Sequence, residues 1–243
     1  MSARLLIDVG NTRLKWTVAT DDGALAPVQA MAHGGDPGAL IEWLPVPDGL
    51  QVAWIANVTG DAAGERLAAA LGVRHRLPTR FARPADGLAG VRLAYEDSSR
   101  LGVDRWLALL AIWGRERAAS CVASAGTALT FDAVDDRGRH LGGVIAPGLV
   151  TAQTAVLGAT RFAASGPSQQ FTRGLGSDTD ACVRQGALHA CAGLIDRLAA
   201  RHPGPRYLIG GDAETIAPHL DGDWQLRPDL VLEGLATMSA RTS

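Results

Sequence analysis

The sequence has few cysteines and aromatic residues, almost no lysine and no long apolar run. Its three cysteines are too few for a disulfide framework and lack zinc-finger spacing, which favours a reducing, cytoplasmic location. No apolar stretch approaches the roughly 20 residues of a membrane-spanning helix, and the N-terminal one is too short for a signal peptide. The formal net charge of -2 leaves no basic field, so neither nucleic acid nor a membrane is expected as a partner.

The residues that are present predict a globular protein with one unusual basic side chain. The chain has 243 residues, of which 47% are hydrophobic and 20% charged, enough for two packed lobes. Of its 23 basic residues 22 are arginine, and Lys15 is the single lysine. Lysine is a compact point charge, whereas arginine is a planar fork. Lys15 is therefore either a surface residue retained by chance or a contact for a phosphate group.

The first half begins with a predicted β-hairpin. Residues 4–9 form a short apolar run, Gly10 to Thr12 have turn chemistry, and residues 13–19 alternate as a second strand. Further elements follow from capping and periodicity: a short helix at 36–44, a strand at 52–58, a helix from Asp61 to Leu71 ended by Gly72, and a helix at 105–119.

The second half repeats this start. Residues 121–134 again read strand, turn and strand, and when Gly10 is set on Gly126, Asp8 falls on Ser124. A helix at 178–201 and a strand at 206–209 come later in this half. We therefore predict an α/β fold with an internal duplication, in which lobes 1–117 and 118–243 face one cleft that holds the ligand.

The two hairpins have the composition of phosphate-binding turns. A glycine turn exposes backbone N–H groups, Asp8 could hold Mg²⁺, and Thr12 and Lys15 could meet phosphate oxygens. An ordinary hairpin with an Asx turn is the alternative, but its repetition at Gly126 and Thr127 favours a phosphate clamp. The later turn of residues 210–212 could lie beneath a nucleotide base or simply join a strand to a helix.

A second group of polar residues lies at the predicted helix start. Asp104 and Arg105 follow a loop containing Tyr95, which places a base beside a guanidinium that binds anions. Asp104 could instead be an N-cap. Glu96, Asp97 and the six histidines are interpreted as solvated groups, and the histidines lack metal-ligand spacing, so no zinc site is expected.

Four motifs in register closely resemble type III pantothenate kinases. They are IDVGNT (7–12) with Lys15, Tyr95 followed by LGVDR (101–105), AGTALTFD (125–132), and GGVIAPG (142–148). The resemblance implies an actin-like and sugar-kinase-like fold of two ribonuclease-H-like lobes, usually a homodimer. It also implies ATP-dependent phosphorylation of pantothenate, the first step of coenzyme A synthesis.

The resemblance also assigns roles by position. ATP with Mg²⁺ would be bound by Asp8, Val9, Gly10, Asn11, Thr12, Arg13, Leu14 and Lys15, with Asp8 at the metal and Thr127 contacting ATP from the other lobe. Pantothenate would be held by Tyr95, Gly102, Val103, Asp104, Arg105 and, across the dimer, Thr179. Asp104 would accept the proton of the attacking hydroxyl, since kinases catalyse chiefly by positioning and charge neutralisation.

Two departures from the family pattern stand out. Ser124 occupies the position of an acid that binds a monovalent cation, which weakens the expectation of K⁺ or NH₄⁺ dependence, unless another acid such as Asp132 replaces it. Ser98 stands where the family has proline, a change expected to affect only the stiffness of the loop. Two other functions remain open: a regulatory protein of the same fold, and a kinase of another hydroxy acid or sugar.

Overall fold

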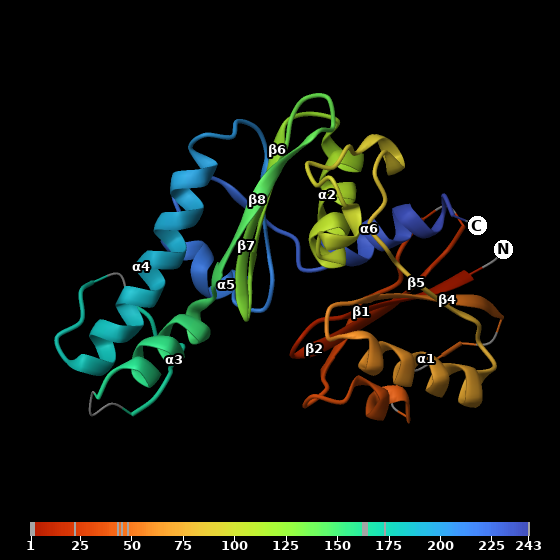
Figure 1. The fold of residues 1–243 in the computed structure, drawn as a ribbon, viewed down its shortest axis with the longest axis horizontal. Coiled ribbons are helices and arrows are strands. Elements are labelled where there is room, and N and C mark those ends of the chain that lie inside the picture. Colours follow the sequence, from red (N-terminus) through yellow and green to blue (C-terminus); the bar gives the residue numbers. More distant parts are fainter. Residues whose placement is uncertain are drawn as a thin grey trace. The chain divides into compact units, whose positions relative to one another are not determined.

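The computed structural model describes residues 3–21, 23–42, 44, 46–47, 49–161, 165–172 and 174–242. The chain forms two compact units (Figure 1). Unit 1 comprises Met1–Arg115 and Asp229–Ser243, and unit 2 comprises Glu116–Pro228. Each unit is built around its own five-stranded sheet.

The sheet of unit 1 has the strand order β3-β2-β1-β4-β5. Its strands are β1 (Ala3–Val9), β2 (Arg13–Ala19), β3 (Gln29–Ala32), β4 (Leu50–Asn57) and β5 (Thr79–Phe81). The pairs β1–β2 and β2–β3 are antiparallel, whereas β4 and β5 run parallel to β1. The predicted hairpin of residues 4–19 and the strand at 52–58 are therefore confirmed within one or two residues.

Unit 2 repeats this sheet in the order β8-β7-β6-β9-β10. Its strands are β6 (Ser120–Ala125), β7 (Ala128–Val134), β8 (His140–Pro147), β9 (Arg206–Ile209) and β10 (Trp224–Leu226). The strand directions match those of unit 1 pair by pair. The predicted duplication is confirmed, and Asp8 in β1 and Ser124 in β6 occupy equivalent places.

Helices complete each unit. Unit 1 has the helices α1 (Asp61–His75), α2 (Val103–Glu116) and α6 (Leu230–Ser239), and the 3-10 helices η1 (Pro37–Glu42), η2 (Leu88–Gly90) and η3 (Ser98–Arg100). Unit 2 has α3 (Leu149–Ala159), α4 (Thr179–Ala199), α5 (Ala213–Ile216) and η4 (Ala217–His219). Figure 1 shows α1 and α6 on opposite faces of the first sheet. The predicted helices at 105–119 and 178–201 correspond to α2 and α4.

The core of unit 1 follows from the alternation of side chains along β1. Leu5, Ile7 and Val9 are fully buried on the face that packs against α1 and η1. Successive side chains of a strand point to opposite faces. Asp8 therefore lies on the other face of the sheet, which is the face that α6 covers.

The end of α1 differs from the sequence prediction. The helix continues through Gly72 to His75 and ends at Arg76, which has a left-handed backbone with a φ of 51°. A glycine inside a helix costs only about 1 kcal/mol, which is small beside the complete burial of Leu67 and Leu71 on the sheet. Asp61 is the first helical residue, and the N-cap position falls to Gly60.

The last segment of the chain also differs from the prediction, which placed all of 118–243 in the second lobe. The helix α6 belongs to unit 1, although the change of unit after residue 115 lies close to the expected boundary. Gly234 allows α6 to approach α2 closely, because a Cβ atom there would lie 2.0 Å from the carbonyl oxygen of Leu107. Leu230, Leu232 and Leu235 are fully buried as a result.

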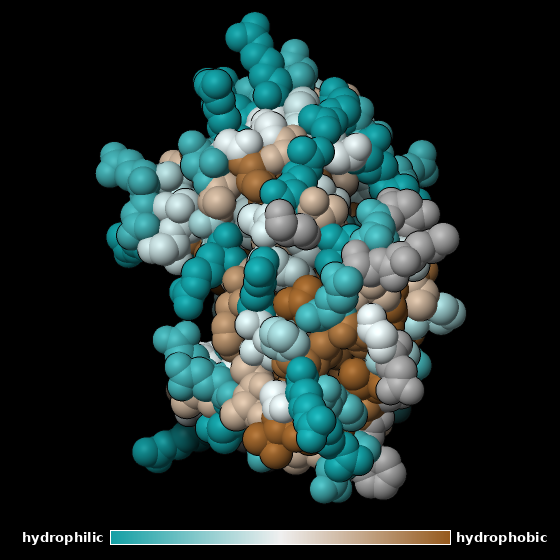
Figure 2. Space-filling model, turned by 90° about the vertical axis from the view of Figure 1, so that its right-hand side faces the viewer, coloured by the Kyte–Doolittle hydropathy of each residue, from teal (hydrophilic) through white to brown (hydrophobic). Residues whose placement is uncertain are grey.

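The surface carries scattered hydrophobic side chains. On the side shown in Figure 2 hydrophilic residues cover most of the surface, and hydrophobic residues are visible between them in several places, more of them in the lower half of the view. Among the residues that the structure describes, no helix combines the length and apolar character needed to cross a bilayer.

Candidate active site

The hairpin of β1 and β2 places an acid opposite a base. Asp8 and Lys15 are direct partners in the antiparallel register, and both side chains are half-buried. The next pair, Val9 and Leu14, is buried in the hydrophobic core on the opposite face. The side chains of Val9 and Leu14 therefore cannot line the ATP site, and only their main-chain groups remain available to a ligand.

The turn between the two strands is tight and exposed. The Gly10 N–H donates to the carbonyl oxygen of Arg13 at 3.0 Å. A Cβ atom at Gly10 would lie 3.3 Å from that same oxygen, so a larger residue would require the turn to shift by a few tenths of an ångström. Asn11, Thr12 and Arg13 are exposed. The turn thus presents backbone and hydroxyl groups to solvent, as a phosphate-binding turn requires.

His33, which directly follows β3, forms hydrogen bonds with the main chain of this turn. Its ring Nε2 lies 2.8 Å from the Gly10 carbonyl oxygen, and its ring Nδ1 accepts a hydrogen bond from the Gly35 N–H at 3.1 Å. The main-chain N–H of His33 donates to the Thr12 carbonyl oxygen at 3.3 Å. His33 is 7% exposed, so the expectation of a solvated histidine is wrong here. No sequence signal marks it, because the contact depends on the pairing of β3 with β2.

Asp104 stands at the start of α2, in the same unit as the hairpin. The helix begins at Val103, so Asp104 is its second residue and the position before the helix belongs to Gly102. The N-cap interpretation of Asp104 is therefore wrong. A Cβ atom at Gly102 would lie 2.8 Å from the Asp104 Oδ1, so a side chain there would make the Asp104 carboxyl group turn away from its present position. The Val103 side chain is buried, so it packs against the protein and not against a ligand.

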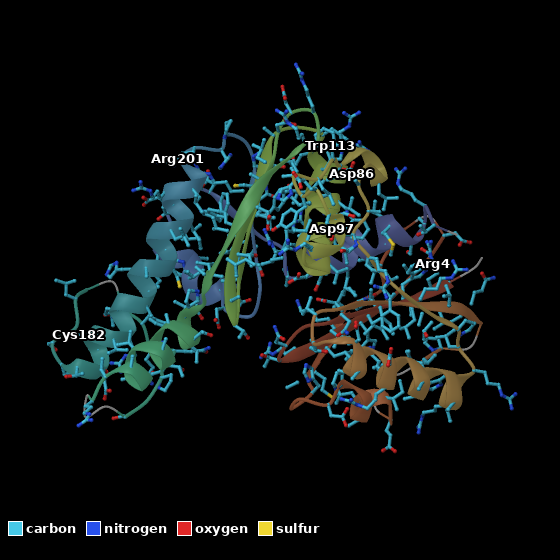
Figure 3. The ribbon with its side chains drawn as sticks, in the orientation of Figure 1. Arg4, Asp86, Asp97, Trp113, Cys182 and Arg201 are labelled. Atoms are coloured by element: carbon cyan, nitrogen blue, oxygen red, sulfur yellow. The ribbon has the colours of Figure 1, made fainter. Side chains whose placement is uncertain are left out.

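Arg105 and Tyr95 form the polar pair beside this acid. The Arg105 side chain is buried, and its Nη1 donates to the Tyr95 hydroxyl oxygen at 3.2 Å. The intervening loop is ordered by Asp97, labelled in Figure 3, whose Oδ1 accepts from the Ser99 N–H at 3.0 Å. The Ser99 hydroxyl group donates to the same oxygen at 2.6 Å, and these two hydrogen bonds lower the pKa of Asp97. Ser98 is the first residue of η3, and Asp97 is the N-cap of this short helix.

The electrostatics of unit 1 centre on Asp8. Burial, and then the negative charge of Asp104, raise the pKa of Asp8 from 3.8 to about 7, while Lys15 acts in the opposite direction. The carboxyl oxygens of Asp8 and Asp104 are hard ligands of the kind that Mg²⁺ prefers. No group of three or more metal-ligating side chains occurs among the described residues. A magnesium ion would therefore complete its coordination with phosphate oxygens and water.

The second hairpin is held by close backbone packing. The Gly126 N–H donates to the Ala128 carbonyl oxygen at 3.2 Å, and Thr127 is exposed. A Cβ atom at Gly148 would lie 1.7 Å from the Gly126 carbonyl oxygen. Gly210 has a φ of 99°, and a Cβ atom there would lie 2.1 Å from the carbonyl oxygen of Ala125. The predicted turn at 210–212 thus supports the end of β6.

Ser124 lies on the opposite face of β6 from the core, across from Thr130. Asp132 shares that face, but its Oδ1 lies 2.9 Å from the Nε2 of His140 and both side chains are buried. The expectation that all six histidines are solvated is therefore wrong for His140 as well. Asp132 could replace the missing acid at position 124 only by leaving this partner.

Thr179 belongs to unit 2 and is the first residue of α4. The Asp178 carboxylate caps the helix by accepting from the Ala181 N–H at 2.8 Å. Thr179 is exposed and lines a cavity of about 670 Å³ formed with Val156 of α3 and Cys182 of α4, the latter labelled in Figure 3. Of the predicted site residues, Asp8, Lys15 and Asp104 thus lie together in unit 1, whereas Thr127 and Thr179 belong to unit 2.

Comparison with known proteins relates this arrangement to one enzyme family. Residues 4–201 match the family model of type III pantothenate kinase. A type III pantothenate kinase from Xanthomonas campestris pv. campestris (strain B100) is 39% identical over 245 residues, which span 98% of each chain. One from Nitrosococcus oceani is 34% identical over 253 residues, 98% of this chain and 94% of that protein.

Solved structures share the fold at low sequence identity. Component A of the (R)-2-hydroxyglutaryl-CoA dehydratase from Acidaminococcus fermentans has a TM-score of 0.58 at 11% identity, over 99% of this chain and 97% of its own. A ROK family glucokinase from Streptomyces griseus, in complex with glucose and AMPPNP, has a TM-score of 0.51 at 13% identity over the full length of both chains. The predicted actin-like and sugar-kinase-like fold is confirmed.

Proposed function

This chain belongs to the type III pantothenate kinase family, and we propose which of its residues perform the reaction of that family. The enzyme transfers the γ-phosphoryl group of ATP to pantothenate, the first step of coenzyme A biosynthesis. The observation that supports our assignment is the convergence of Asp8, Lys15 and Asp104 on one side of the first sheet.

Asp104 is the proton acceptor in our proposal. The hydroxyl oxygen of pantothenate forms a bond to the γ-phosphorus, the bond from that phosphorus to the bridging oxygen of ADP breaks, and the hydroxyl proton passes to Asp104. It lies in the first turn of α2, where the N-terminus of the helix attracts negative charge. Arg105, held by Tyr95, is next to it and suits the pantothenate carboxylate.

Asp8 and Lys15 serve ATP in our proposal. Lys15 and the backbone of the turn at Gly10 to Arg13 bind phosphate oxygens, and Thr12 adds a hydroxyl group. Asp8 would hold Mg²⁺, which neutralises phosphate charge when bound. A divalent cation beside Asp8 would offset the repulsion from Asp104, so the raised pKa supports a metal ligand rather than a second base.

In unit 2 we assign Thr127 to a contact with ATP and Ser124 to the position of the monovalent cation. A hydroxyl group is a weaker cation ligand than a carboxylate, so activation by K⁺ or NH₄⁺ should be weak. Gly210 packs against the main chain of Ala125. The exposed Gly211 is therefore the residue of this turn that we assign to a contact with the nucleotide base of ATP.

We also propose that the enzyme is a cytoplasmic homodimer, with Thr179 touching pantothenate bound to the partner subunit. The apolar cavity beside Thr179 and the exposed Val150 and Val156 of α3 support an interface there. The three cysteines are free thiols, which agrees with a reducing compartment. Sedimentation equilibrium of the protein and a Val156→Asp variant tests the dimer, and a wild-type monomer would exclude it.

ATP turnover with a panel of acceptors tests the proposed function. We expect ADP formation to depend on pantothenate and on Mg²⁺, with at most a trace of activity on glucose or on other hydroxy acids. Turnover on a sugar alone would assign the enzyme to another substrate. No turnover with any acceptor, in a protein that still binds ATP, would favour a regulatory protein of the same fold.

A further inference from the structure

The hydrogen bonds of His33 determine the tautomer of its ring. The Gly35 N–H can only donate, so the Nδ1 that it meets at 3.1 Å is an acceptor. The Gly10 carbonyl oxygen can only accept, so the Nε2 that lies 2.8 Å from it carries the proton. The buried imidazole is thus a neutral ring that links the segment after β3 to the turn between β1 and β2.

We propose that His33 is a positioning residue for ATP, which orients the peptide units of the phosphate-binding turn. The C=O and N–H of a trans peptide point in opposite directions. Because His33 binds the Gly10 carbonyl with its ring and the Thr12 carbonyl with its main-chain N–H, the N–H groups of Asn11 and Arg13 must point away from His33. The inference rests on the proposed role of this turn in binding ATP.

The surrounding chain is built to bring the ring into this place. Strand β3 has only four residues, all exposed, and pairs with β2 up to Ala32 opposite Arg13. Gly34 and Gly35 then have φ values of 57° and 95°, a backbone conformation that glycine adopts readily. These two glycines turn the chain back, so that the Gly35 N–H reaches the ring of its neighbour His33.

Two amide substitutions separate the two hydrogen bonds of the ring. In His33→Gln the side-chain amide reaches toward the position of Nε2 and can still donate to Gly10. In His33→Asn the shorter amide reaches only the position of Nδ1, so it can accept from Gly35 but leaves the Gly10 carbonyl without its donor. We expect His33→Asn to raise the KM for ATP roughly tenfold, as loss of one buried hydrogen bond does, with the KM for pantothenate unchanged.

His33→Gln is expected to stay within about threefold of the wild-type KM for ATP. His189→Asn, an exposed histidine on α4, serves as the control substitution. Binding of a non-hydrolysable ATP analogue, measured by calorimetry, should weaken in the same order as the KM rises. The ¹⁵N resonances of the His33 ring should show the Nε2–H tautomer in the free enzyme.

The outcomes separate this inference from the proposed site. If Asn and Gln at position 33 weaken ATP binding equally, or if both substrates are affected alike, His33 has only a structural role and the inference fails. If Lys15→Ala weakens ATP binding but His33→Asn leaves it unchanged, the inference again fails while the site stands. If neither variant changes ATP binding, the assignment of the hairpin to ATP is wrong.

Discussion

The negative charge of Asp104 in α2 raises the pKa of Asp8 in β1, two carboxyl groups that lie 96 positions apart in a chain of 243 residues. Burial contributes more than this repulsion, and Lys15 only partly opposes both. The protein thus holds an acid that is easily protonated near neutral pH at the position where the proposed reaction needs a metal ligand. A pKa shifted this far by burial and by a neighbouring charge is typical of residues in functional sites.

The free enzyme should lose stability as the pH rises toward 7. The pKa of Asp8 is about 7 in the folded protein, whereas an unperturbed aspartate has 3.8, so the folded state binds more protons between these pH values. Its contribution is therefore fully present below about pH 4 and is lost as the pH rises through 7. Each pKa unit corresponds to about 1.36 kcal/mol, so the total is on the order of a few kcal/mol.

Asp8→Asn should flatten this dependence, measured as the free energy of unfolding from pH 4 to pH 8. Asp97→Asn is the control, because the pKa of Asp97 is lowered below 3.8 and its contribution is lost only at more acidic pH, so this variant should keep the wild-type slope between pH 4 and pH 8. If the free energy of unfolding of Asp8→Asn depended on pH as that of the wild type does, the raised pKa of Asp8 would be contradicted.

Asp104→Asn should lower kcat by roughly a hundredfold or more, the usual scale for loss of a general base, while ATP binding survives. The amide keeps the size of the carboxyl group but cannot accept a proton. Asp61→Asn, at the first turn of α1, is the matched control for loss of an acid near a helix N-terminus. Near-normal turnover in a folded Asp104→Asn protein would exclude Asp104 as the base.

Lys15→Ala should weaken ATP binding or slow phosphoryl transfer, and Lys15→Arg should restore the activity only in part, because a planar fork does not replace a point charge. Since Lys15 is the single lysine, an amine-directed reagent can label only this side chain and the N-terminus. We expect ATP with Mg²⁺ to protect Lys15 from labelling, as peptide mass spectrometry would show. Equal labelling with and without ATP would place Lys15 outside the site.

Activation by K⁺ should be weak or absent, because Ser124 offers a neutral hydroxyl group where a carboxylate would bind the ion more strongly. The initial rate is measured against K⁺ concentration at constant ionic strength set by a bulky organic cation. Ser124→Asp should create saturable activation. Steep activation of the wild type at low millimolar K⁺ would mean that other oxygen ligands replace the acid.

Gly210→Ala should destabilise unit 2 by several kcal/mol, since its Cβ would lie 2.1 Å from the Ala125 carbonyl oxygen and the residue has a φ of 99°. Gly211→Ala is the matched control, because no atom lies within 4 Å of its Cβ position. Thermal unfolding of the two variants measures the difference. Equal stability of both would show that the turn relaxes without loss.

The hairpins and their duplication could be predicted from the sequence, because strand alternation and glycine turns are local properties of the chain. Short-range pattern also located α2 and α4, whose boundaries shift by two residues or fewer except at the end of α2. The motif residues Asp8, Lys15 and Asp104 were identified in the same way. Local pattern could not show that Val9 and Leu14 turn into the core, although the period of two along a strand requires it once the face of Asp8 is known.

Only the tertiary structure decided which distant groups meet. The α6 helix packs with the first unit because Gly234 fits against the backbone of Leu107, and nothing near Gly234 in the sequence specifies that partner. His33 reaches Gly10 through the pairing of β3 with β2. Burial and the approach of Asp104 set the pKa of Asp8. Sequence patterns report on neighbours along the chain, whereas these contacts depend on how separate elements pack. The sequence alone therefore determined which chemical groups are present, and the tertiary structure determined the environment of each group.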